Sequence, residues 1–152
     1  MDEAEPALIT AGAEKIVCIA RSWIGTPYHH QASLKGVGTD CLGLVRGLWR
    51  EVHGTDPEMP PAYSRDWAEA NGRETMLEAA RRHLVEIAVE DAGPGDVLIF
   101  RLRPGTVAKH AGIVATHDTM IHAMEGRPVS EVPLGRWWRR RVAAAFRFPG
   151  AK

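Results

Sequence analysis

The organisation of this chain follows from the segment Gly36-Val37-Gly38-Thr39-Asp40-Cys41-Leu42-Gly43-Leu44-Val45. Glycines are followed by helix-capping oxygens and then by an apolar helical pattern, so a loop should lead into a helix whose first turn holds Cys41. The positive end of a helix dipole favours thiolate over thiol, and we therefore expect a lowered pKa for this cysteine. Such a thiolate is a candidate nucleophile. The alternative is a small buried residue, because free cysteine is among the most buried residue types.

Length and charge limit the class of protein. A chain of 152 residues fits one domain, 1–152, in which we expect residues 1–10 to form a flexible tail. Lys+Arg and Asp+Glu both number 19, and this balance provides no bulk attraction to nucleic acid or to anionic membranes. Arg136 and residues 139–141 form a local basic cluster beside two tryptophans. We expect a solvated edge there, with binding of an acidic polymer or a partner protein as the alternative.

The N-terminal sequence Met1-Asp2-Glu3-Ala4-Glu5-Pro6 is acidic and lacks the basic and apolar parts of a signal peptide. No apolar run approaches the ~20 residues that a membrane-spanning helix needs. We therefore expect synthesis in the cytoplasm without membrane insertion. Two cysteines suggest no disulfide framework. Cys18 lies in the apolar helical segment 16–20 and is predicted to be inert core.

Apolar periodicity predicts helices first and strands afterwards. The helices are expected at 11–24, 40–53 and about 67–83, the last capped by Ser64 or Asp66. Five strands are expected at 97–100, 110–114, 118–124, 129–134 and 141–148, and Leu84, Ile87 and Val89 mark a further short candidate strand. This order favours an α+β fold, with N-terminal helices packed on an antiparallel sheet of about five strands.

Two of the seven histidines, His110 and His122, lie inside strands of one predicted hairpin. A three-residue loop at 115–117 would place them directly opposite each other, where Cβ atoms are roughly 4.5–5.5 Å apart. A two-residue loop at His117-Asp118 would place them on opposite faces of the sheet. The two histidines therefore indicate a shared site only if the hairpin has the three-residue loop.

These residues form a consistent set for thiol catalysis. Cys41 is the candidate nucleophile and His110 the candidate base that takes its proton and later protonates a leaving amine. His122 would fix the tautomer and orientation of His110. Backbone N–H groups at the helix start would receive the oxyanion. Gly112 would let the helix approach the sheet.

Zinc binding is the competing interpretation, because Cys41, His110 and His122 are three possible ligands. Apart from Asp40, however, no Asp, Glu or His stands at ligand spacing beside Cys41. We therefore rank a metal site below thiol catalysis and expect no cofactor.

Five segments carry a resemblance to a known family, in this order along the chain: Gly25-Thr26-Pro27-Tyr28, Asp40-Cys41-Leu42-Gly43-Leu44-Val45, Pro94-Gly95-Asp96-Val97-Leu98-Ile99-Phe100, His110-Ala111-Gly112-Ile113-Val114 and Ile121-His122-Ala123. They resemble the opening motif, nucleophile motif, glycine-aspartate strand and two histidine strands of the NlpC/P60 cysteine peptidases. The resemblance covers nearly the whole chain and implies a reduced papain-like fold.

The resemblance also implies a substrate, the peptidoglycan stem peptide. Cleavage typically falls between the γ-carboxyl of D-glutamate and a diamino acid such as diaminopimelate. Tyr28 would line the substrate site near the oxyanion, and Asp40 would bind the amino end of the stem peptide. Two positions depart from the family pattern: Leu42 stands where serine is usual, and His29-His30-Gln31-Ala32 stands where Trp-Gly-Gly is frequent.

The segment Tyr63-Ser64-Arg65-Asp66-Trp67-Ala68-Glu69 resembles the phage-tail subgroup, which is also found in gene-transfer-agent particles. We therefore expect incorporation into a phage-like tail, with tail proteins as partners, to breach the cell wall. One alternative is a structural tail component with the same fold and little hydrolase activity, for which Leu42 is the motivation. Another is acyl transfer to a lipid or an amine by the same triad.

Overall fold

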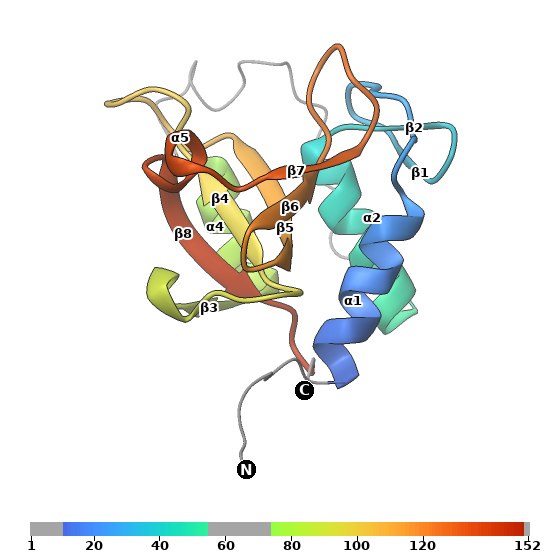
Figure 1. Cartoon of the computed structure of the whole chain (residues 1–152), viewed down its shortest axis with the longest axis horizontal. Coiled ribbons are helices and arrows are strands. Elements are labelled where there is room, and N and C mark those ends of the chain that lie inside the picture. Colours follow the sequence, from blue (N-terminus) through green and yellow to red (C-terminus); the bar gives the residue numbers. More distant parts are fainter. Residues whose placement is uncertain (1–10, 55–73, 151–152) are drawn as a thin grey trace.

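The computed structural model describes residues 11–54 and 74–150. The expected N-terminal tail, the first part of the expected third helix with its caps, and the tail-subgroup motif at 63–69 lie outside these residues. Within the described ranges, helices lie against one antiparallel sheet, so the predicted α+β class is confirmed (Figure 1).

Three helices carry the N-terminal part of the fold: α1 (Ala11–Ser22), α2 (Cys41–His53) and α4 (Thr75–His83). The first helix ends two residues before its expected end at 24, and the others end where predicted. Gly54 terminates α2 in the left-handed conformation, with φ of 80°, as its position after the apolar pattern predicts. Two short helical turns, η1 (Val89–Asp91) and α5 (Arg136–Arg139), were not predicted.

The main sheet has six strands in the order β3-β8-β4-β5-β6-β7, and every neighbouring pair is antiparallel. Its strands are β3 (Val85–Ile87), β4 (Val97–Phe100), β5 (His110–Thr116), β6 (Thr119–His122), β7 (Ser130–Pro133) and β8 (Val142–Arg147). Two short strands, β1 (Ser33–Leu34) and β2 (Gly38–Thr39), form a separate pair in the loop before α2.

Side-chain alternation divides the core between the two faces of the sheet. The helices α1, α2 and α4 pack on one face, in the larger cluster, where Leu44 and Leu48 meet Ile113 and Ala111. A smaller cluster on the other face contains residues such as Phe100, Val114 and Met120, with Trp138 of α5 packed against it. Because His110 alternates with Ala111, it belongs to this second face.

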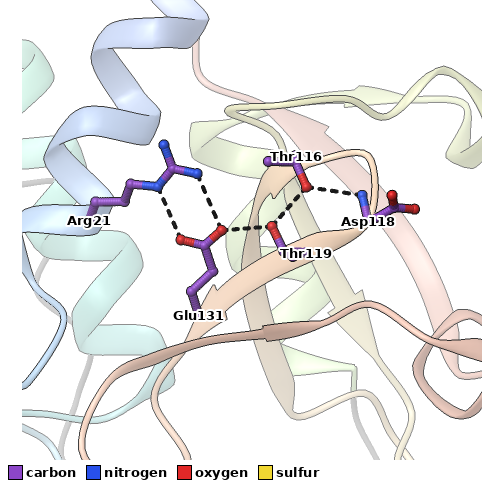
Figure 2. Close-up of polar contacts among 5 residues, drawn as sticks. All are labelled: Arg21, Thr116, Asp118, Thr119 and Glu131. Carbon is purple, nitrogen blue, oxygen red and sulfur yellow. Dashed lines mark hydrogen bonds and ion pairs between the residues drawn. The ribbon is translucent and has the colours of Figure 1, made fainter.

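A polar network holds the turn between β5 and β6 (Figure 2). Thr116 Oγ1 and Thr119 Oγ1 are 2.9 Å apart, and Thr116 also accepts a hydrogen bond from the backbone N–H of Asp118. Thr119 donates to Glu131 on β7, whose carboxylate in turn forms an ion pair with Arg21 of α1. The turn of the histidine hairpin is therefore connected to both a neighbouring strand and the first helix.

Candidate active site

Asp40 builds the start of the helix that carries the cysteine. Its Oδ1 accepts from the backbone N–H of Gly43 at 2.7 Å, which is an N-terminal cap. Its Oδ2 accepts from the backbone N–H of Gln31 at 2.8 Å, so the same carboxylate fastens the preceding loop. The side chain is 5% exposed. The predicted contact of Asp40 with the amino end of a substrate stays a prediction.

Tyr28 lies in the loop that runs alongside the residue before this cap. The backbone N–H of Thr39 donates to the carbonyl of Pro27, and that of His29 donates to the carbonyl of Thr39, each at 3.0 Å. This pairing places half-buried Tyr28 beside the N-terminus of α2. Its predicted role in lining the substrate site is consistent with that place and stays a prediction.

Cys41 opens α2 as predicted, but its environment differs from the expectation. Its Sγ donates to the backbone carbonyl of Lys109 at 3.8 Å, immediately before His110. Burial, and next the charge of Asp40, raise the pKa of the Cys41 thiol to about 12, although the N–H of Ala111 acts in the opposite direction. The expected lowering of this pKa is therefore wrong, because the start of β5 covers part of the half-buried Cys41 and disfavours the charged thiolate.

Cys18 also differs from its prediction. It is exposed on α1, whereas its neighbours Ile16 and Val17 are buried. The interpretation of Cys18 as core is therefore wrong, since the helical periodicity turns the following position outward.

His110 and His122 are brought together on the second face of the sheet. His110 Nε2 lies 2.9 Å from His122 Nδ1, and both residues are buried. Burial, and then the neighbouring His122, lower the pKa of His110 to about 3. Burial, and then the charge of Arg127, lower the pKa of His122 to about 4. Both imidazoles are therefore neutral at neutral pH, and an N–H of one ring donates a hydrogen bond to the bare nitrogen of the other.

The hairpin register that brings them together is not the expected one. The turn has two residues, His117 and Asp118, between the paired Thr116 and Thr119. An even turn alone would separate the histidines, but the register shifts between Val114 and Thr116. The resulting bulge adds one residue to β5 and restores both histidines to one face. The predicted shared face of the two histidines is confirmed, whereas the predicted three-residue loop and the placement of His110 directly opposite His122 are wrong.

Gly112 makes room for side chains of the neighbouring strand of the hairpin, not for the helix. A Cβ built on it would lie 2.7 Å from Met120 Sδ and 3.6 Å from His122 Cβ. It faces the second side of the sheet, away from Leu44 and Leu48 of α2. The expectation that Gly112 admits the helix is therefore wrong.

The residues that sequence reasoning missed are aromatic. The ring of Trp138 stacks on His110, with centroids 5.4 Å apart and planes 28° apart, and meets His122 at 5.3 Å and 88°. Phe100 contacts both His110 and Trp138. The paired tryptophans were visible in the sequence, but a four-residue helix has no periodicity that would assign one of them to the histidines.

The arrangement therefore combines a half-buried thiol at a helix start with two hydrogen-bonded neutral imidazoles. The sulfur lies against the backbone on either side of His110. Direct transfer of its proton to His110 stays a prediction. Among residues 11–54 and 74–150, no three His, Cys, Asp or Glu side chains are placed to hold a metal ion. Within the same ranges, no helix has the length and apolar character required to cross a membrane.

Two curated proteins are similar to this chain in sequence over most of its length. A protein named gamma-DL-glutamyl hydrolase from Bacillus subtilis is 27% identical over 134 residues, which cover 88% of this chain and 29% of that protein. The probable endopeptidase NlpC of Escherichia coli is 28% identical over 84% of this chain and 72% of its own length. The chain thus spans less than a third of the first relative and most of the second.

Solved structures agree in fold. The NlpC/p60 domain of the peptidoglycan hydrolase SagA is 25% identical, covers 90% of this chain and 98% of its own, and superposes with a TM-score of 0.63. An NlpC/P60 family protein from Bacillus cereus, 21% identical over 90% of this chain and 40% of its own, has a TM-score of 0.65. The family model described as NlpC/P60 matches residues 25–147, from the turn after α1 to the end of β8. The chain therefore belongs to the NlpC/P60 family of cysteine peptidases and cell wall hydrolases.

Proposed function

We propose that this chain is a peptidoglycan endopeptidase that cleaves stem peptides between the γ-carboxyl of D-glutamate and a diamino acid such as diaminopimelate. The family and the SagA domain support the substrate class. The observation that carries the proposal is the 2.9 Å contact between His110 Nε2 and His122 Nδ1, beside the residues that the Cys41 sulfur touches. The hydrogen bond occupies Nε2 of His110 and fixes the orientation of the ring. Nδ1 is then the nitrogen that can accept the proton of the nucleophile.

The proposed reaction starts from neutral partners. As Cys41 Sγ attacks the amide carbonyl, His110 Nδ1 takes the thiol proton, because the free thiol is too weakly acidic to ionise alone. Backbone N–H groups at the start of α2 stabilise the oxyanion. The proton then passes to the leaving amine, a thioester forms on Cys41, and water hydrolyses it with His110 as base. His122 holds the tautomer of His110 throughout.

The decisive experiment is digestion of purified peptidoglycan, with the released fragments identified by mass spectrometry. The unmodified protein should release fragments that end in D-glutamate with a free γ-carboxyl. Cys41→Ala should lower this release by about 10³-fold or more while its circular dichroism is unchanged. Cys18→Ser is the matched control and should retain full activity. Equal release by the Cys41 variant would overturn the assignment.

A second candidate is a structural component with this fold and little hydrolase activity. The raised pKa of Cys41 favours it, because a neutral thiol is a poor nucleophile until a base acts on it. This candidate would be supported if the protein released no fragments from peptidoglycan that an active hydrolase, tested in parallel, does digest.

The setting in a phage-like or gene-transfer-agent tail is proposed from the sequence at 63–69. Tail proteins would then deliver the domain to the cell wall after its synthesis in the cytoplasm. Purified particles should contain the protein. Particles with a complete set of tail subunits from which it is always missing would refute this setting.

A further inference from the structure

Trp138 contacts both imidazoles of the candidate dyad from one side. Its ring stacks on His110 and meets His122 edge-on. The two imidazoles themselves lie nearly perpendicular, at 84°. We propose, on the basis of the function proposed above, that Trp138 is a positioning residue that holds His110 in the plane required for its hydrogen bond to His122 and screens the pair from water.

The helix that carries Trp138 is fastened to the hairpin that carries the histidines. Arg139 of α5 donates from Nη2 to the backbone carbonyl of His117, in the turn between β5 and β6. The N–H of Leu134, just before α5, donates to the carbonyl of Asp118 in the same turn. Because α5 is hydrogen-bonded to the hairpin that carries the histidines, the position of the indole relative to the two imidazoles is fixed.

A second tryptophan, Trp137, contacts Trp138 edge-on. Trp137 packs against it at 4.8 Å and 81°, and the Arg141 guanidinium lies 3.8 Å from the Trp137 ring centroid. Trp137 is 52% exposed, whereas Trp138 is partly buried in the smaller core cluster. The exposed ring therefore offers a control position that lacks direct contact with His110.

Two effects of Trp138 on His110 oppose each other. Stacking on an aromatic ring favours a charged imidazolium, whereas exclusion of water favours the neutral ring. The Cys41 sulfur lies against the backbone carbonyl just before His110, and Arg127 acts on His122. Arg139 of α5 and Arg141, two residues after α5, donate to backbone carbonyls. Burial is the largest cause of the low His110 pKa. Loss of the indole should therefore raise that pKa.

The test is a titration of the histidine ring nitrogens by NMR, which needs no substrate. Trp138→Ala should raise the pKa of His110 by about one unit or more. Trp137→Ala should leave the titration unchanged. If Trp138→Ala is folded and titrates as the unmodified protein does, the proposal is overturned.

A second pair of variants decides the question even if Trp138→Ala does not fold. Trp138→Phe keeps a planar ring, and Trp138→Leu keeps apolar bulk without one. The nitrogen shifts that report the His110–His122 bond should persist in the Phe variant and be lost in the Leu variant. Identical shifts in the two variants would overturn the positioning role.

Hydrolysis measurements complete the test and separate it from the proposed function. Trp138→Leu should lower kcat by about 10- to 100-fold with KM nearly constant, and Trp138→Phe should restore most of the rate. An unchanged kcat in the Leu variant would contradict the proposal. If the unmodified protein itself released no stem-peptide fragments, the proposed function would fail, and the titration would still decide how Trp138 acts on the histidines.

Discussion

His110 and His122 are hydrogen-bonded without being cross-strand partners. The ladder pairs Ile113 with Ile121, and one step further along it Gly112 stands opposite His122. His110 is thus a diagonal neighbour, at a Cα separation that long side chains can still span. The missing side chain of Gly112 provides the space across which the His122 ring reaches His110 Nε2 at 2.9 Å.

Filling that space should weaken the dyad. Gly112→Val places methyl groups toward Met120 Sδ and His122 Cβ, which would lie only 2.7 and 3.6 Å from a Cβ at this position. Because Met120 and His122 are both buried, we expect a loss of stability of about 1–3 kcal/mol. We also expect kcat to fall by about 100-fold as His110 loses its partner. Urea unfolding and stem-peptide hydrolysis measure the two effects.

Gly47→Ala is the matched control. A Cβ at Gly47 would press on the ring of Trp23 between α2 and α1, far in the fold from the histidine face. This variant should lose comparable stability, while its folded fraction retains kcat. Equal losses of kcat in the two variants would mean that crowding acts through general destabilisation rather than through the dyad.

The buried histidines should make stability depend on pH. Unfolding restores His110 to an ordinary pKa of about 6.5 from its folded value of about 3, so the unfolded chain binds a proton first as pH falls. The free energy of unfolding should therefore fall as pH falls from 6.5 toward 4, by up to about 1.4 kcal/mol per pH unit from this group. His122 acts in the same direction, since its pKa is also lowered.

His110→Gln should reduce that slope, as measured by urea unfolding between pH 6.5 and 4.5. His117→Gln, at an 87% exposed side chain, should leave it unchanged. The same slope in His110→Gln and in the unmodified protein would show that carboxylates, rather than the buried imidazole, cause the dependence.

In the resting protein Cys18 should react faster than Cys41, although the sequence predicted an activated Cys41 and an inert Cys18. At pH 7.5 the half-buried Cys41 is almost entirely thiol, because its pKa is raised to about 12, whereas Cys18 is exposed. Iodoacetamide should therefore alkylate Cys18 at least about tenfold faster than Cys41. The single-cysteine variants Cys18→Ser and Cys41→Ser isolate each site for mass spectrometry. Rapid stoichiometric labelling in Cys18→Ser would mean that the resting site already holds a thiolate.

Local chemistry explains what the sequence predicted well. A capping carboxylate, glycines before it and apolar residues after it determine the start of α2 from a few neighbouring positions, so Asp40 and Cys41 were placed correctly. The shared face of His110 and His122 was predicted too, although through the wrong loop.

Long-range contacts explain what it missed. The hairpin bulge is held by Thr116 and Thr119 through Glu131, whose partner Arg21 is 110 positions away in the sequence. The raised pKa of Cys41 likewise depends on β5 covering it. Neither contact leaves a periodic signal, so no local pattern could have indicated them.

Asp96 tests whether the glycine-aspartate strand has a structural role. Its carboxylate accepts two hydrogen bonds from Arg147 at 2.9 Å and one from the N–H of Gly93 at 2.9 Å, which joins the start of β4 to the end of β8. Asp96 is buried while Arg147 is 45% exposed, so we expect Asp96→Asn to lose about 2 kcal/mol of stability in urea unfolding. The folded fraction should keep its kcat, and Asp118→Asn, at a 73% exposed side chain, should be neutral in both measurements. A lower kcat in Asp96→Asn at unchanged stability would instead assign this carboxylate to the reaction.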